Sequence, residues 1–534
     1  EQLNIDGNNV TLEAQRIGKL LGNDVLIDLG AGIANLTTEQ LAALASAEHD
    51  DVFFDDLTDK SKLRIVQRDD VNVAARGSLS VTATGDVFLG GERDLNLYNV
   101  QGDTIRIKTN GSIESANGSN VVLSGHDVVL ESSAGSIGGK GALHLQVGGD
   151  LTARAQLLNL VAHGNLNVQR LTGLDSLTLG VVGGNLMSSS QMGENLLGGN
   201  INLSVDGNVG SFSDRVQLGT SGLGQQISLD IGGDAYLGAL QGAASTAGSL
   251  TFAEANVDGL LDIAQARDLL QNADWTVGGL VLALDNQWNM AADTHLVSGN
   301  GIFARVADQA VLGNISTVNS GANIDIQARL LQASADNQVW QAANQLTLRS
   351  HGDIGSPVWK VGVGGQHLDI SSSQGALYLR LLDGIQSGSL SSAQAQFLTS
   401  AGNVALDSVT SQNAQVVLDG MGDVAIDTLS AKLDLDLSGE SLSLGSANSA
   451  QGNVLINFTG AVSADELHSA SQRVEVNAGA AQLGNVSAAD TLSVHTTADA
   501  LRIGTGSSGG DLTLTTLAGS LANIHFGVLA DPTT

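Results

Sequence analysis

Short runs in which apolar and polar residues alternate recur along most of this chain. Residues 135–168 contain three such runs, whose apolar positions are Leu143/Leu145/Val147, Leu151/Ala153 and Leu166/Val168. Alternation with period two is typical of a β-strand that buries one face. Gly-Asp or Gly-Asn comes directly before the second and third runs, and such pairs mark bends between strands. The pattern therefore predicts short, half-buried strands joined by tight corners.

These strand openings repeat at a loose but recognisable period. The tripeptide Gly-Asp/Asn-apolar occurs fourteen times. Where it is densest, its spacing of roughly 15 to 20 residues lies at the lower end of known solenoid periods. A longer unit also recurs at 135–149, 207–233 and 352–365, in which Gly-x-apolar-Gly precedes a strand that ends in Gly-Gly. We interpret the chain as a repetitive winding with insertions between some of its turns.

The order of residues at the bends favours a winding over a β-sandwich. Hairpins of antiparallel sandwiches usually turn at Asn-Gly or Asp-Gly, whereas here glycine comes first. Strands of successive turns would then stack in parallel around one narrow apolar column, which suits the 67 glycines and the 3% aromatic residues. The predicted fold is all-β, a right-handed parallel β-helix of on the order of 25 turns. Asn side chains at the corners are expected to stack amide on amide from turn to turn.

Three domains are predicted. Residues 1–36 would form the first turns, with strand signals at 3–6 and 25–28, and residues 63–534 the main β-helix rod. Residues 37–62 form an acidic insertion, in which Thr-x-x-Gln at Thr37 and good helix formers predict a short helix from Thr38 to about Glu48. The rod contains an irregular insertion at about 254–295 that could be helical by spacing, although no clear cap precedes Leu260 and a continued winding is favoured.

Charge and cysteine content narrow the classes of partner. Lys and Arg number 23 against 55 Asp and Glu, which gives a net charge of −32 that would repel a phosphate backbone. Nucleic acid is therefore not expected as a partner. The absence of cysteine excludes disulfides and thiolate metal sites. It suits export as an unfolded thread, and it would also suit a cytosolic protein. We expect no transmembrane segment, because no apolar run has the length of a membrane span.

Four groups of residues could carry chemistry, and each has a simpler structural interpretation. Acidic residues of the insertion could bind Ca²⁺, but they lack EF-hand spacing and fit a solvated loop. Scattered histidines lack zinc-site spacing. Two tryptophans in the irregular tract could face a sugar, although packing is the commoner fate. Two outward acids resemble a catalytic pair but are ordinary on a strand face. The acidic residues of the insertion are Asp50, Asp51, Asp55, Asp56 and Asp59, and the histidines include His126, His144, His163, His351 and His367. The tryptophans are Trp275, Trp288, Trp340 and Trp359, of which the first two lie in the irregular tract, and the outward acids are Asp434 and Asp436. We expect no catalytic, cofactor-binding or metal-binding residue and no cofactor.

The repeat units at 135–155 and 352–379, GSIGGKGALHLQVGGDLTARA and GDIGSPVWKVGVGGQHLDISSSQGALYL, resemble repeats of giant filamentous-haemagglutinin-like bacterial exoproteins. These include leukotoxin-type filamentous adhesins and biofilm-matrix adhesins exported by two-partner secretion. The resemblance covers most of the chain from about Leu63, at the level of repeat style. An amino-terminal secretion domain with its Asn-Pro signature is not seen, since the first proline is Pro357.

The resemblance implies a non-catalytic, extracellular stalk of a bacterial adhesin. It implies attachment to exopolysaccharide or other cell-surface glycans, and passage through an outer-membrane pore during export. Two alternatives remain open at this point: a carbohydrate-active β-helix enzyme, and the stalk of a contact-dependent toxin delivery protein.

Overall fold

A computed structural model describes residues 3–20, 25–28, 51–54, 62–66, 68–189, 194–220, 226–239, 249–498, 501–518 and 521–522. These residues contain strands and no helix. Contacts divide the chain into two compact units, Glu1–Arg267 and Asp268–Thr534. The strands form a parallel β-solenoid of about 21 turns, so the predicted all-β winding is confirmed and a sandwich of hairpins is excluded.

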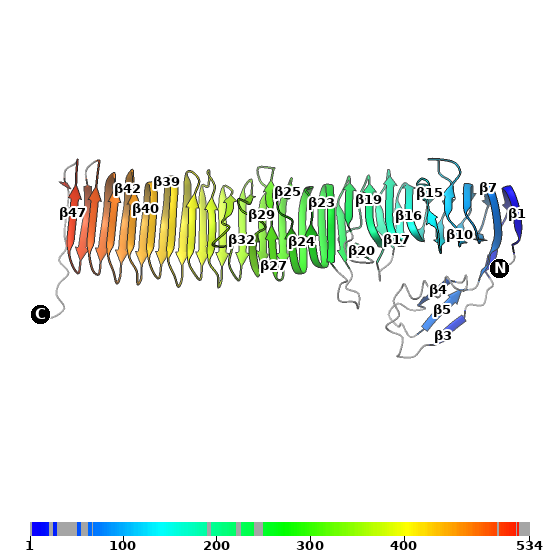
Figure 1. Ribbon diagram of the computed structural model, residues 1–534, viewed down its shortest axis with the longest axis horizontal. Helices are drawn as coiled ribbons and strands as arrows, with labels where there is room; N and C mark the ends of the chain where they lie inside the picture. The colour runs from blue at the N-terminus through cyan, green and yellow to red at the C-terminus, as the bar shows by residue number, and fades with distance from the viewer. Residues whose placement is uncertain are drawn as a thin grey trace. The chain divides into compact units, whose positions relative to one another are not determined.

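In the first unit, the solenoid strands pair in parallel with strands of the neighbouring turns (Figure 1). One interior column runs through Leu160, Leu179, Leu203, Leu229 and Ala255, all of which are buried. Most of the sequence separations between neighbouring residues of this column exceed the period of roughly 15 to 20 residues predicted from the glycine tripeptides. The turns are therefore longer than expected and fewer in number. The longest strands of the unit are β1 (Ile5–Ala14), β7 (Val71–Ala83), β16 (Asp150–His163), β17 (Leu166–Val182), β19 (Leu196–Val205) and β23 (Ser249–Gln271).

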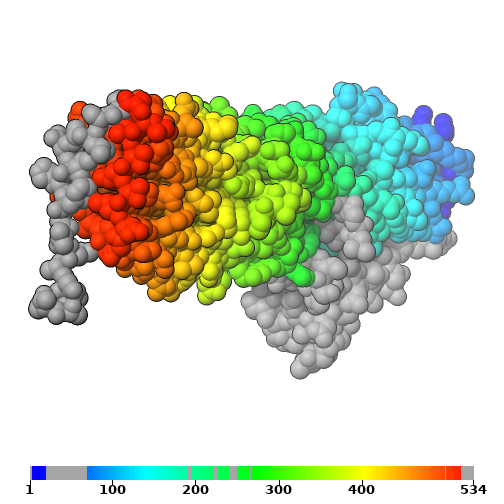
Figure 2. All heavy atoms as spheres, turned by 60° about the vertical axis from the view of Figure 1, so that its left-hand side comes forward, coloured from blue at the N-terminus to red at the C-terminus, as the bar shows by residue number. Residues whose placement is uncertain are grey.

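The second unit repeats this arrangement with shorter turns. Its interior column includes Val416, Leu435, Val454, Val474 and Leu492, each fully buried, and the steps between them are nearly even. In Figure 2 the surface of this unit passes from green to red in ordered bands, because each turn packs on its neighbours in sequence. Its longest strands are β24 (Trp275–Met290), β39 (Val416–Ala431), β40 (Leu435–Ser449), β42 (Ala461–Ser469) and β44 (Ala480–Ala488).

Asn and Asp at the corners link consecutive turns by a different contact from the one predicted. The side-chain Oδ1 of Asn185 accepts a hydrogen bond from the backbone N–H of Asn208 at 2.7 Å. Asn208 does the same for Asp234, and Asp234 for Leu260, both at 2.8 Å. The expectation of amide-on-amide stacking is wrong for this ladder, because the corner leaves a backbone N–H facing the preceding turn and that donor needs an acceptor. Amide-on-amide contacts do occur elsewhere, where Asn319 Nδ2 donates to Asn300 Oδ1 at 2.8 Å and Asn344 Nδ2 donates to Asn323 Oδ1 at 2.9 Å.

The recurrent Gly-x-apolar-Gly unit marks the exit of a loop from the solenoid wall. The last glycine of each copy, Gly138, Gly210 and Gly355, has a φ of 72°, 64° and 75°, respectively. A Cβ on Gly355 would lie 2.5 Å from the carbonyl oxygen of Tyr378 on the next turn, so the position requires glycine for space as well as for backbone conformation. After Gly210 and Gly355, residues 211–214 and 356–359 form matching turns with the same hydrogen bonds.

The amino-terminal region departs from the predicted winding. Strand β5 (Lys62–Val66) pairs antiparallel with both β3 (Val25–Asp28) and β4 (Asp51–Phe54) in a separate three-stranded sheet. The sequence pattern predicts solenoid strands at residues 25–28 and from residue 63 onward. Alternation identifies a strand but not its partner, which is why this assignment failed. The predicted helix from Thr38 to Glu48 lies outside the described residues, as do Asp50, Asp55, Asp56 and Asp59.

The continued winding favoured for the tract at 254–295 is confirmed, and the tract is not an irregular insertion. It consists of the solenoid strands β23 and β24 and the start of β25 (His295–Ser298). Within β23 the buried residues Leu261, Ile263, Ala266 and Leu269 are not evenly spaced. An extra residue at two points shifts the phase of the alternation, and this shift gives the segment its helix-like spacing.

Candidate functional site

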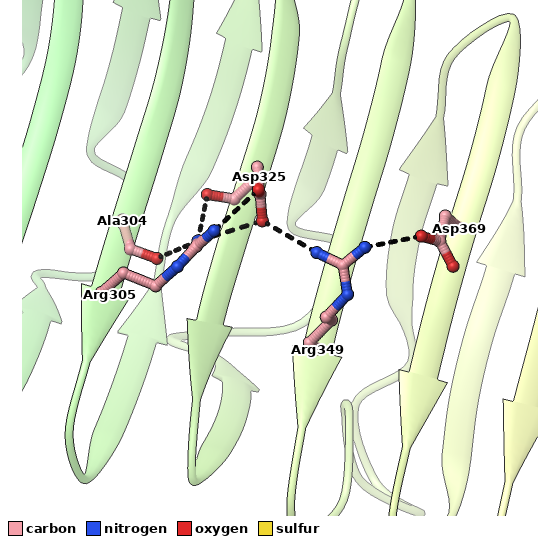
Figure 3. A network of polar contacts seen from close by, with 5 residues as sticks. All are labelled: Ala304, Arg305, Asp325, Arg349 and Asp369. Atoms are coloured by element: carbon pink, nitrogen blue, oxygen red, sulfur yellow. Dashed lines mark hydrogen bonds and ion pairs between the residues drawn. The ribbon is translucent and has the colours of Figure 1, made fainter.

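A ladder of four charged side chains crosses four successive turns of the second unit (Figure 3). Arg305 is on β26 (Gly301–Val306), Asp325 on β29 (Asn323–Ala328), Arg349 on β32 (Gln345–Ser350) and Asp369 on β34 (His367–Ser372). Each lies on the outward phase of its strand, next to buried aliphatic residues. The alternation of sign along the ladder lets each inner residue contact the residues before and after it.

The contacts of this charge ladder are close. Both terminal nitrogens of Arg305 donate to the carboxylate of Asp325, at 3.0 and 2.8 Å. Arg349 reaches Asp325 at 3.5 Å and Asp369 at 2.8 Å. Because these side chains are partly exposed, solvent screens the charges and each pair contributes at most about 1 kcal/mol. The four charges compensate one another, so the ladder links adjacent turns and leaves no net charge to attract a ligand.

The first unit contains a groove of about 390 Å³ on its outward surface. It crosses β16, β17, β19, β21 (Ile227–Ile231) and β23. Two parallel rows of outward residues line it, with one residue of each row on each strand. One row is Asn159, Thr178, Asn202, Ser228 and Glu254, and the other is Val161, Gly180, Ser204, Asp230 and Asn256. Amides, hydroxyls and carboxylates therefore line the groove together with a larger area of apolar surface, and the lining includes no aromatic ring or basic side chain.

The outward histidines form neighbour contacts that sequence spacing did not reveal. His144 Nδ1 lies 3.0 Å from His163 Nε2, and the two rings stack with their centroids 5.4 Å apart. Burial lowers the pKa of His144, and the neighbouring His163 lowers it further. His351 and His367 contact the hydroxyls of Ser373 and Ser387 on the next turn. No cluster of three or more metal-binding side chains occurs among the described residues.

Three of the four tryptophans are interior residues. Trp275, Trp288 and Trp340 are fully buried, and the first two lie in β24 and not in a loop. Trp340 also donates from Nε1 to the carbonyl of Gly313 at 3.0 Å. Trp359 is 41% exposed at the end of the 356–359 turn. Packing is thus the role of the tryptophans in the tract where a sugar contact was considered.

The two carboxylates considered as a catalytic pair have separate environments. Asp434 lies at a corner, where its Oδ1 accepts hydrogen bonds from the backbone and side-chain nitrogens of Asn453 at 2.7 and 2.9 Å. Asp436 is exposed on β40. These hydrogen bonds at the corner explain why an aspartate follows the turn at position 434, and the explanation requires no catalytic role.

Sequence reasoning missed both the charge ladder and the groove. The ladder contacts join residues 20, 24 and 20 positions apart, which are turn lengths of this unit. Opposite charges separated by one turn are the signal that could have found the ladder, once the turn length was known. The spacing expected from the glycine tripeptides was too short, and the turn length varies along the chain, so neighbours could not be assigned.

Neither a family model nor a characterised protein nor a solved structure matches this chain. Among the described residues there is no helix that could span a membrane. The solenoid, its corner ladders, its charge ladder and its groove are therefore the observations from which a function is inferred.

Proposed function

We propose that this chain is a non-catalytic stalk segment of an extracellular bacterial adhesin that attaches cells to exopolysaccharide or other surface glycans. The observation that carries the proposal is the continuous parallel pairing within each of the two units, reinforced by corner side chains that bond the next turn. Such stacking distributes load over many backbone hydrogen bonds, and each turn can fold onto the preceding one. These properties suit a chain that leaves the cell unfolded and then holds a load.

The composition is consistent with this function. A net charge of −32 keeps a chain with a long apolar core soluble, and the absence of cysteine removes crosslinks that would hinder export. The repeat units that resemble filamentous-haemagglutinin-like exoproteins include the loop-forming glycines Gly138 and Gly355. The resemblance and the architecture thus support the same class of protein by separate arguments.

A carbohydrate-active enzyme is the second candidate, and one observation favours it. Asp230 and Glu254 both line the groove of the first unit. Two carboxylates beside a bound sugar are the minimum for glycoside hydrolysis. Both side chains are exposed, however, whereas a catalytic acid is usually tuned by burial together with a specific charged partner. The pair therefore supports an enzyme less well than the stacked architecture supports a stalk.

One experiment separates the two candidates. Beads coated with the purified chain are passed over surfaces that carry neutral, amino-substituted or acidic polysaccharides, and released reducing ends are measured in the effluent. An adhesin segment retains beads on a glycan surface and releases no sugar. Release of oligosaccharides that Asp230→Asn or Glu254→Gln abolishes would establish the enzyme instead, and failure to bind any glycan would count against an attachment role.

A further inference from the structure

The geometry points to the groove across β16, β17, β19, β21 and β23 as a binding site for an extended glycan without carboxylates, either neutral or amino-substituted. This inference rests on the proposed function and specifies where and what this chain would bind. The groove residues belong to one unit and come from five strands that pair side by side, so the backbone of the solenoid holds them in place.

The spacing of the groove residues suits a linear polymer. Neighbouring strands lie about 4.8 Å apart, so each row offers a new side chain about every 4.8 Å and five strands span roughly 19 Å. That repeat is close to the length of one sugar ring in an extended chain. A glycan lying across the strands could therefore meet an equivalent polar position at each successive ring, over about four rings.

Most hydrogen-bonding side chains of the groove are free to bind a ligand, whereas Asn159 donates to the Gly138 carbonyl and Asn256 donates to Glu254. Within the described part of the chain, no hydrogen bond to another protein group involves the side chains of Thr178, Asn202, Ser204, Ser228 or Asp230. Hydroxyls and amides that both donate and accept match the hydroxyls of a sugar. Val161 adds an apolar contact, and Gly180 beside it leaves room above the sheet. Recognition would depend on hydrogen bonds, since no aromatic ring is available for stacking.

Charge selects the class of glycan. Asp230 and Glu254 are the charged residues of the groove lining, and no Lys or Arg accompanies them. A polyuronate would bring like charges close to these carboxylates, which is unfavourable. A neutral chain meets no such repulsion, and the ammonium groups of an amino-substituted chain would be attracted to the carboxylates.

Gly180 provides a substitution that fills the groove. A Cβ at this position would lie 3.4 Å from Val161 Cγ2, an ordinary contact, and its φ lies outside the range that favours glycine. Gly180→Arg should therefore fold while placing a long side chain across the groove. Ser443→Arg is the matched control, because Ser443 is an exposed outward residue of β40 in the other unit and the substitution adds the same charge.

The test is isothermal titration calorimetry of the full chain and its variants with tetrasaccharides of neutral hexose, glucosamine and galacturonate, after thermal unfolding has confirmed that the variants fold. We expect the wild-type chain to bind the neutral or glucosamine tetrasaccharide, Gly180→Arg to weaken this binding at least tenfold, and Ser443→Arg to change it less than twofold. Asp230→Asn should weaken glucosamine binding and leave neutral binding within twofold.

Three results would overturn the inference. Glycan binding that Gly180→Arg leaves intact would place the site elsewhere and would not affect the proposed function. Preference for galacturonate would overturn the assigned class of glycan and leave the proposed function standing. Absence of binding to all three tetrasaccharides and to the polysaccharide surfaces would refute both the groove and the glycan attachment of the proposed function.

Discussion

At the scale of single residues, a turn of the solenoid brings together side chains that are far apart in the sequence, and these contacts change their chemistry. His144 is the clearest example, because burial and the adjacent ring of His163 both disfavour its protonated form. The lowered pKa means that the unfolded chain takes up this proton at a higher pH than the folded chain does. The resulting contribution to the free energy of unfolding is complete above pH 6.5, the ordinary pKa of histidine, and is lost as the pH falls through the folded pKa.

The histidine pair gives a prediction for an NMR titration. We expect the pKa of His144 to lie below 6.5 and His163→Gln to raise it part of the way back, because burial, the larger cause, remains. His367→Gln serves as the control, since it removes a histidine from the other unit, and should leave the His144 pKa unchanged. An unperturbed His144 in the wild-type chain would contradict the pairing.

At the scale of elements, the corners connect turns through side-chain oxygens, and Asp234 tests this connection. Asp234→Ala removes the acceptor for the Leu260 N–H, while Asp234→Asn keeps an oxygen in the same place. A hydrogen bond of this kind contributes about 1 kcal/mol net, so we expect the Leu260 amide to exchange its hydrogen roughly fivefold faster in Asp234→Ala. Near-wild-type exchange is expected in Asp234→Asn. Equal exchange rates in all three proteins would show that the corner oxygen does not stabilise the ladder.

The elements also show how far the sequence could predict the fold. Alternation correctly placed Leu143, Leu145 and Leu151 in the core, because one buried face is a local property of a strand. It failed for Val25–Asp28 and Lys62–Val66, since pairing partners depend on distant segments. It also failed across β23, where extra residues shift the alternation. The groove could not be predicted, because it depends on which outward positions of five turns become neighbours, and the unequal lengths of these turns hide that register.

At the scale of the whole molecule, parallel stacking makes the free energy of unfolding a sum of contributions from each turn and from its interfaces with adjacent turns. In the second unit, β31 (Val339–Gln341) pairs with β28 (Asn314–Thr317) and β33 (Val361–Gly364), and the indole of Trp340 fills the interior between these turns. Each turn depends directly on its two neighbours, and interface energies of this kind act locally. Damage to one turn should therefore remain near that turn, in contrast to a globular domain with a single shared core.

Substitution of Trp340 tests this locality by hydrogen-exchange mass spectrometry. Trp340→Ala leaves a large cavity and should cost about 3 to 5 kcal/mol. Because the cavity destabilises mainly the turns that contact it, we expect protection from hydrogen exchange to fall in β28, β31 and β33. Protection should remain at wild-type levels in β43 (Val474–Ala478) and β45 (Leu492–Thr496). Trp340→Phe, which keeps most of the volume but loses the bond to Gly313, should show the same pattern with a smaller amplitude. A uniform loss of protection across the second unit would mean that its turns unfold together as one cooperative body. That result would contradict the claim that stability is a sum of local interfaces between neighbouring turns.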